Sequence, residues 1–282
     1  MENENLEQFL NKVVLGNCIE GLQKLPAHSV DLIIADPPYN LSKGSNLHFE
    51  RSAKLNGMGG IWDKRMLNWD NMPFYEYWQF TEAWLSEAKR VLKKNGSMWV
   101  YGTYHNIGVV NVIMQELGIE IINEIIWYKR NAFPNLRNSR FTASHENLLW
   151  AHIGNAKSRE YTFNYEKVKN GRFPEDSLKK YGKQMRTVWD IPNNKTSEEL
   201  KYGKHPTQKP LRICERIILA STKEKDTILV PFCGSGSECV AALKLDRHFI
   251  AFEIDPVYVA VANKRIEQEG ANKKQICLEA SI

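Results

Sequence analysis

The chain has 282 residues, of which 43% are hydrophobic and 25% are charged, and its formal net charge is +5. This length buries a substantial core and suits one α/β domain with a modest insertion better than two equal domains. The sequence contains no run of 18 or more apolar residues and no basic leader followed by an apolar stretch, so we expect a cytoplasmic protein with no membrane partner.

The five cysteines are scattered, odd in number and free of any Cys-x-x-Cys pair. This spacing favours neither a zinc site nor a disulfide framework, and we expect no metal. Cys233 lies in a glycine-rich segment, where a small apolar filler is a better interpretation than a nucleophile.

The first elements alternate between strand and helix. Strands are predicted at 12–15 and 31–35, with a short helix at 18–25 between them. The apolar run 30–35 ends in an acid and two prolines. This pattern is typical of a buried parallel strand that delivers a rigid loop to the carboxyl edge of a sheet.

That loop, Asp36-Pro37-Pro38-Tyr39, has a composition that suits an exocyclic amino group on a planar base. The prolines restrict the backbone, so the loop is preorganised. It offers the Asp36 carboxylate and backbone carbonyls as acceptors, lacks proline N–H donors, and adds the flat face of Tyr39. The structural alternative is a strand that simply ends at a proline turn.

The middle of the chain begins with 41–72, which has four glycines and no periodicity. We interpret it as a flap that orders when a substrate binds, with Trp62 and Trp69 as contacts, or else as a flexible insertion. Helices are then predicted at 73–92, ended by Asn95-Gly96, and at 105–117. Strands are predicted at 97–101, 119–128 and 146–152, and the alternation predicts a mainly parallel, doubly wound sheet.

Positive charge is concentrated in one interval. Residues 155–204 carry twelve Lys and Arg against seven Asp and Glu, with seven aromatic residues among them. Interleaved basic and aromatic residues suit nucleic acid, and a second basic run lies nearby, although a solvated face is the ordinary meaning of such runs. The candidate DNA contacts are Lys129, Arg130, Arg137, Arg140, Lys183 and Arg186.

The carboxyl-terminal part has the pattern of a nucleotide-binding unit. A helix ending at Ser221 is predicted to begin with Thr207 as N-cap and Pro210 in its first turn. A strand at 227–230, a glycine loop at 231–237, a helix at 238–245 and a strand at 247–252 follow. Glu253, roughly 20 residues beyond the glycine turn, is a candidate partner of ribose hydroxyls. The alternative is a turn whose glycines serve packing only.

Together these segments resemble the β-class of DNA amino-methyltransferases, which use S-adenosylmethionine and have a circularly permuted motif order. The resemblance covers about 13–266 and rests on the Asp36 loop, Pro-Phe-x-Gly-x-Gly at 231–236, the segment 203–210, and 126–131 with Glu146 and Trp150 downstream. It implies a Rossmann-like fold and duplex DNA as substrate. It also allows for a homodimer and a cognate restriction endonuclease.

The resemblance further implies a division of the chain. The catalytic half is 1–154, the target-recognition insertion is 155–204, and the cofactor-binding half is 205–282. The catalytic residues are Asp36, Pro37, Pro38 and Tyr39. The cofactor-binding residues are Asn17, Cys18, Asp36, Thr207, Lys209, Pro210, Phe232, Gly234, Ser235, Gly236, Ser237, Glu253 and Ile254.

By the same resemblance, Asp at position 36 favours N6-adenine over N4-cytosine. Methylation of cytosine N4 or of RNA, a DNA-binding protein without catalysis, and a small-molecule methyltransferase are the alternatives. Asn17, Val230 and Ser237 stand where the family commonly has an acid, an acid and a threonine.

Overall fold

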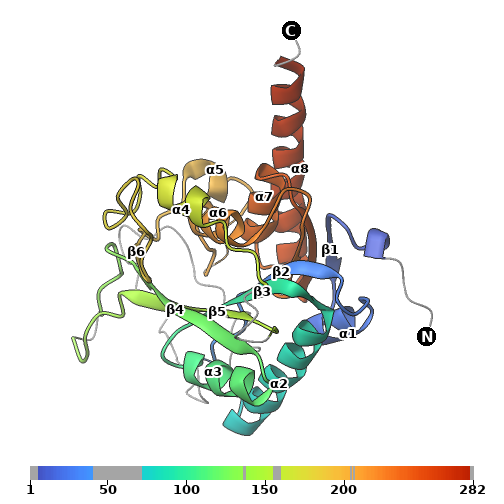
Figure 1. Ribbon diagram of the computed structural model, residues 1–282, viewed down its shortest axis with the longest axis vertical. Helices are drawn as coiled ribbons and strands as arrows, with labels where there is room; N and C mark the ends of the chain where they lie inside the picture. Colours follow the sequence, from blue (N-terminus) through green and yellow to red (C-terminus); the bar gives the residue numbers. More distant parts are fainter. Residues whose placement is uncertain are drawn as a thin grey trace, which may run out of the picture.

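The computed structural model describes residues 6–40, 72–135, 138–154, 160–203, 205 and 207–279, and side chains up to residue 272. A single eight-stranded sheet crosses this part of the chain (Figure 1). Its strands are β1 (Lys12–Leu15), β2 (Val30–Ala35), β3 (Leu92–Gly102), β4 (Glu120–Tyr128), β5 (His145–His152), β6 (Val188–Asp190), β7 (Thr227–Val230) and β8 (His248–Glu253). Their order in the sheet is β1-β8-β7-β2-β3-β5-β4-β6.

The sheet is mainly parallel, as the sequence predicts. β5 runs antiparallel to its neighbours β3 and β4, and the other neighbouring pairs are parallel. Parallel strands deliver their carboxyl ends to one edge, so the loops after β2, β7 and β8 emerge side by side. The segments that follow β2 and β7 therefore meet in space although they are far apart in sequence.

Helices cover both faces of the sheet (Figure 1). One layer holds α1 (Cys18–Gln23), α2 (Phe74–Val91) and α3 (Ile107–Glu116). The other holds α4 (Tyr165–Asn170), α6 (Leu211–Ser221), α7 (Ser237–Lys244) and α8 (Pro256–Glu279). The short elements are a 3-10 turn at Leu6–Gln8 and α5 (Ser197–Leu200).

Strand β2 shows why both layers are needed. Leu32 and Ile34 belong to the core beneath α6 and α7, whereas Ile33 and Ala35 belong to the core beneath α1 and α2. Successive side chains of a strand point to opposite faces, and here both faces are apolar. The apolar run before Asp36 is thus a central, doubly covered strand, and the doubly wound fold is confirmed.

The boundary between α2 and β3 differs from the prediction. The helix ends at Val91, because Leu92 is extended (φ −71°, ψ 133°) and pairs with Val30. Asn95-Gly96 therefore lies within the strand and does not end the helix. A Cβ on Gly96 would lie 2.7 Å from the Asp31 carbonyl oxygen, so the glycine serves close strand packing.

The basic interval 155–204 is tied to the body of the fold. It supplies β6, which pairs with β4, and Trp189 of this strand packs on Trp99 with ring centroids 5.7 Å apart. Asp176 forms an ion pair of 2.5 Å with Arg216 of α6, and both side chains are almost fully buried. Part of the interval therefore completes the core. No helix within the described residues is long and apolar enough to cross a membrane.

Candidate active site

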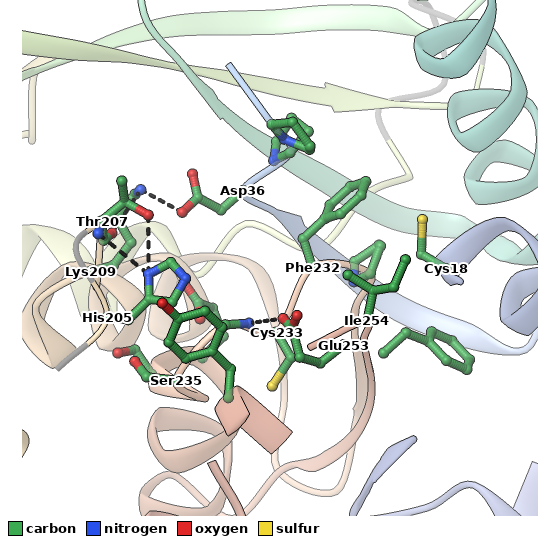
Figure 2. Close-up of a pocket in the computed structure, with 18 of the residues that line it drawn as sticks. Cys18, Asp36, His205, Thr207, Lys209, Phe232, Cys233, Ser235, Glu253 and Ile254 are labelled. Atoms are coloured by element: carbon green, nitrogen blue, oxygen red, sulfur yellow. Dashed lines mark hydrogen bonds and ion pairs between the residues drawn. The ribbon is translucent and has the colours of Figure 1, made fainter. Parts of the chain in front are cut away.

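A cavity of about 280 Å³ opens at the carboxyl edge of the sheet (Figure 2). Its lining comes from segments that follow β1, β2, β7 and β8 and from the chain before α6. In Figure 2, Asp36 and Lys209 face each other on one side, and Phe232, Glu253 and Ile254 lie on the other. These lining segments meet because their strands are parallel neighbours in the sheet: β2 lies beside β7, and β7 lies beside β8.

The glycine loop between β7 and α7 forms one wall. Gly234 and Gly236 adopt left-handed φ values of 51° and 78°. The Glu253 carboxylate accepts the Gly234 N–H at 2.6 Å and the Asp255 N–H at 2.9 Å, which fixes the loop against the end of β8. A carboxylate oxygen has two lone pairs, so Glu253 keeps capacity for further donors.

The opposite wall is built around Asp36, directly after β2. Its Oδ2 lies 2.5 Å from the Lys209 ammonium, and its Oδ1 accepts the Tyr39 hydroxyl at 2.6 Å. The Tyr77 hydroxyl donates to the Pro38 carbonyl at 3.0 Å and anchors the proline loop to α2. The acid predicted from the loop composition is therefore held at the cavity by a cation 173 residues away.

Glu146 extends this cluster, although the sequence analysis did not include it among the site residues. Its Oε1 lies 2.7 Å from the Lys129 ammonium, and its Oε2 lies 3.3 Å from the Tyr39 hydroxyl and 3.6 Å from Lys209 Nζ. The residue belongs to β5, which is antiparallel, so the amino end of this strand reaches the same edge as Asp36. In the sequence, the signal for Glu146 was its place among the residues that carry the family resemblance, downstream of 126–131.

Comparison with known proteins identifies the fold and the chemistry. The model of the N6/N4 DNA methylase family matches residues 30–264. The chain belongs to this family. It is 38% identical to the type II methyltransferase M.HinfI of Haemophilus influenzae over 280 residues, which cover 98% of this chain and 74% of that protein. It is 43% identical to M2.LlaDCHI of Lactococcus lactis subsp. cremoris over 248 residues, covering 88% and 86%.

Solved structures agree with the methylase fold. The complex of M1.HpyAVI with SAM superposes with a TM-score of 0.60 at 26% identity, covering 90% of this chain and 98% of that one. The cytosine-N4-specific PvuII DNA methyltransferase superposes with a TM-score of 0.66 at 19% identity, covering 92% and 89%. At that identity the second likeness concerns the fold alone.

The charges around Asp36 in this methylase are tightly coupled. Burial raises the pKa of Asp36 above its ordinary value, with Glu146 adding to this and Lys209 opposing it. Burial also acts to raise the pKa of Glu146, but Lys209 and Lys129 outweigh it and hold that pKa below its ordinary value. Asp36 and Glu146 overcome the burial of Lys209 and raise its pKa, which keeps this lysine charged.

Two further titratable groups of the methylase line the cavity. Burial, with repulsion from Asp36, raises the pKa of Glu238 to about 7. Glu238 Oε1 lies 3.5 Å from Cys214 Sγ. Burial and the neighbouring Lys209 lower the pKa of His205 to about 4, so this imidazole is neutral at pH 7.

The structure gathers most of the predicted cofactor residues around the cavity. Pro210 and Gly236 are the two that do not line it. Pro210 is the buried N-cap of α6, one residue before the helix begins. Gly236 is the N-cap of α7, where a Cβ would lie 3.0 Å from that of Ala262. These two residues serve the helix starts and their packing.

One predicted helix cap is wrong. Thr207 does not cap α6, since its backbone N–H and hydroxyl bond to the His205 ring at 3.3 and 3.2 Å. Asn17 lines the cavity, but its side-chain oxygen accepts the Ile19 N–H at 2.8 Å and caps α1. Cys233 is buried 3.8 Å from Cys239, as a small apolar filler would be.

The predicted DNA contacts differ in their exposure and in their partners. Lys129 belongs to the Asp36 cluster, and Arg130 bonds to the Asp190 carboxylate at 2.8 Å, so neither presents a free cation. Arg140 is bonded to the Tyr104 hydroxyl at 2.8 Å, an exposed contact. Lys183 and Arg186 are exposed. Arg137 and the flap at 41–72, apart from Met72, lie outside the described residues.

Proposed function

We propose that this methylase transfers a methyl group from S-adenosylmethionine to N6 of adenine in duplex DNA. The observation that carries the proposal is the cavity itself, where the Asp36 carboxylate and the Glu253-bound glycine loop face the same space. The first wall suits an amino group and the second suits a nucleoside. Both parts of a methyl transfer thus have a place within one cavity.

The residues of the second wall fit the cofactor. Glu253 stands at the end of β8 with acceptor capacity for ribose hydroxyls, and Phe232 and Ile254 offer apolar surfaces for an adenine ring. Ile254 is 62% exposed, so it is accessible to a ligand. When bound, S-adenosylmethionine supplies an electrophilic methyl group.

The first wall holds the reacting base. An N6 amino group inside a base stack is out of reach of a methyl donor, so the adenine is turned out of the duplex. Tyr39 provides a face for the extruded ring, while the Asp36 carboxylate and the Pro37 carbonyl accept hydrogen bonds from N6. These bonds draw the nitrogen lone pair out of conjugation and aim it at the methyl group. In well-oriented reactions, positioning of this kind lowers the activation barrier by up to roughly 7–11 kcal/mol.

As the amino nitrogen forms a bond to the methyl carbon, the bond from that carbon to the sulfonium sulfur would break, S-adenosylhomocysteine would leave as a neutral thioether, and the nitrogen must lose one proton. Asp36 is the nearest base by position, and its pKa, raised by burial, favours temporary protonation. Lys209 limits that rise and thereby favours the ionised form of the carboxylate. Because the adenine N6 nitrogen attacks the methyl group directly, no covalent enzyme intermediate is needed.

The choice of adenine rests on Asp36, because the resemblance associates an acid at this position with N6. Arg140, Lys183 and Arg186 are the exposed cations that we assign to DNA phosphates. A homodimer, a cognate restriction endonuclease and a flap at 41–72 that orders on DNA stay predictions.

The test is transfer of labelled methyl from S-adenosylmethionine to unmethylated bacterial DNA, followed by digestion to nucleosides. Label in N6-methyladenine supports the proposal, and label in N4-methylcytosine replaces adenine by cytosine. An Asp36→Ala variant should lose transfer and retain cofactor binding, measured by calorimetry. Undiminished transfer by that variant would overturn the role of Asp36.

A further inference from the structure

The Tyr39 hydroxyl has two acceptors within reach but only one proton to donate. It lies 2.6 Å from Asp36 Oδ1 and 3.3 Å from Glu146 Oε2. The shorter distance makes Asp36 the acceptor in this structure. The Tyr39 side chain is largely buried, with a residue exposure of 7%, so its hydroxyl has little access to water.

Both oxygens of Asp36 are engaged in this state. Oδ2 bonds to the Lys209 ammonium at 2.5 Å, and Oδ1 bonds to the neutral Tyr39 hydroxyl. Both bonds end on a carboxylate and are charge-assisted, but only the lysine bond also joins two opposite charges, which attract each other beyond the hydrogen bond itself. Each oxygen keeps a second lone pair, but an amino group that binds at Oδ1 competes with the Tyr39 hydroxyl for the same acceptor, and the uncharged hydroxyl is released more readily than the lysine.

Glu146 is held beside the Tyr39 hydroxyl, where it can accept the hydrogen bond if that hydroxyl leaves Asp36. Lys129 holds Oε1 at 2.7 Å, which leaves Oε2 facing the Tyr39 hydroxyl. The Glu146 side chain is 13% exposed, and Lys209 Nζ lies 3.6 Å from its carboxylate, so Lys129 and Lys209 both oppose the negative charge of Glu146. Rotation of the hydroxyl proton about the bond between the ring and its oxygen exchanges one acceptor for the other.

We propose that Glu146 is a positioning residue that takes over the Tyr39 hydrogen bond when a substrate amino group binds to Asp36. The exchange frees Asp36 Oδ1 for the amino group and keeps the buried hydroxyl paired, so the Tyr39 ring stays in place. No covalent bond changes in this step. The inference rests on the proposed function, because it requires an amino substrate at Asp36.

A double-mutant cycle with Glu146→Ala and Tyr39→Phe tests the exchange. Single-turnover methyl transfer and DNA affinity are measured for the wild type, both single variants and the double variant. We expect Glu146→Ala to slow transfer about tenfold with little change in DNA affinity, since one hydrogen bond is at stake. In the Tyr39→Phe background, which has no hydroxyl to relocate, the same change should slow transfer less than about threefold.

Glu146→Gln tests the proposal in a variant that keeps side-chain volume and an acceptor oxygen, and it should be faster than Glu146→Ala. Glu120→Ala, at the opposite end of the β4–β5 pair, is the matched control and should transfer at the wild-type rate. Equal losses from Glu146→Ala in both backgrounds, or a loss confined to DNA affinity, would overturn the exchange while leaving the proposed function intact. A wild type that methylates no nucleic acid would overturn both.

Discussion

Asp36 and Glu146 are two carboxylates in one cluster whose surroundings move their pKa values in opposite directions. Burial prevails at Asp36, whereas the two lysines prevail at Glu146. The difference suits a division of roles, because the group with the raised pKa is the better temporary proton acceptor. Lys209 sets the balance, since it contacts both acids.

The pH dependence of methyl transfer should report on Lys209. Under the proposed role of Asp36, transfer needs its ionised carboxylate, so activity should fall as the pH drops through the pKa of Asp36, and Lys209 lowers that pKa. A Lys209→Met variant should therefore be slower and should lose activity at a higher pH than the wild type. The measurement is the pH profile of single-turnover transfer, with Lys24→Met, an exposed lysine, as the control. An unshifted profile would show that Lys209 does not act on Asp36.

Glu238 predicts a pH-dependent stability. Its pKa in the folded chain is raised from 4.5 to about 7, so the folded state holds the proton more tightly than the unfolded state. The free energy of unfolding therefore decreases as the pH rises from about 4.5 to about 7. Glu238→Gln removes this loss and should stabilise the protein at pH 8 by on the order of 3 kcal/mol, with little gain at pH 4.

Denaturant unfolding of both proteins at several pH values measures this difference. Glu82→Gln, at an exposed position of α2, should show no gain between pH 5 and pH 8. A pH-independent difference between wild type and Glu238→Gln would contradict the raised pKa.

At the scale of elements, α6 is joined to the basic interval by a buried pair. Arg216 meets Asp176 at 2.5 Å, and its guanidinium lies over the rings of Phe173 and Trp189 at 4.5 and 5.0 Å. The pair holds the chain between α4 and β6 against the helix that precedes β7. This part of a predicted recognition region thus has a structural role.

Asp176→Ala should lower the free energy of unfolding by about 3–5 kcal/mol, because it leaves a buried guanidinium without its counter-charge. Glu215→Ala is the matched control on α6. Its partner Lys244 is 41% exposed, so the loss should be below about 1 kcal/mol. Chemical denaturation measures the free energy of unfolding of both variants. Equal losses would show that the buried Asp176–Arg216 pair stabilises the fold no more than the exposed pair does.

At the scale of the whole molecule, the sequence predicted every described strand except β6, together with the doubly wound sheet and the two walls of the cavity. Apolar runs and the spacing from the glycine loop to Glu253 are local patterns, and they sufficed for this. What it missed depends on distant neighbours. Lys129 looked like a surface cation because its partner Glu146 lies on another strand. The cap at Thr207 is an exception, since the partner of Thr207, the His205 ring, is only two residues away.

The sheet order also predicts how the chain divides. A fragment of residues 1–222 lacks β7 and β8, which are partners of β2 and β1. Without them the central strand loses one neighbour and β1 has no place in the sheet. The fragment should show no cooperative unfolding transition by near-ultraviolet circular dichroism. A sigmoidal transition like that of the full chain would contradict this dependence.

The pairing of β2 with β7 affects how the chain folds during its synthesis on the ribosome. The Asp31 carboxylate, on β2, accepts a hydrogen bond from the N–H of Thr227, which lies 196 residues later. At a synthesis rate of roughly 5–20 residues per second, β2 emerges about 10–40 s before its partner. An unpaired apolar strand edge invites aggregation during that interval. The nascent chain therefore needs its early helices, or a chaperone, to shield β2, and it can methylate nothing until its last strands have been made.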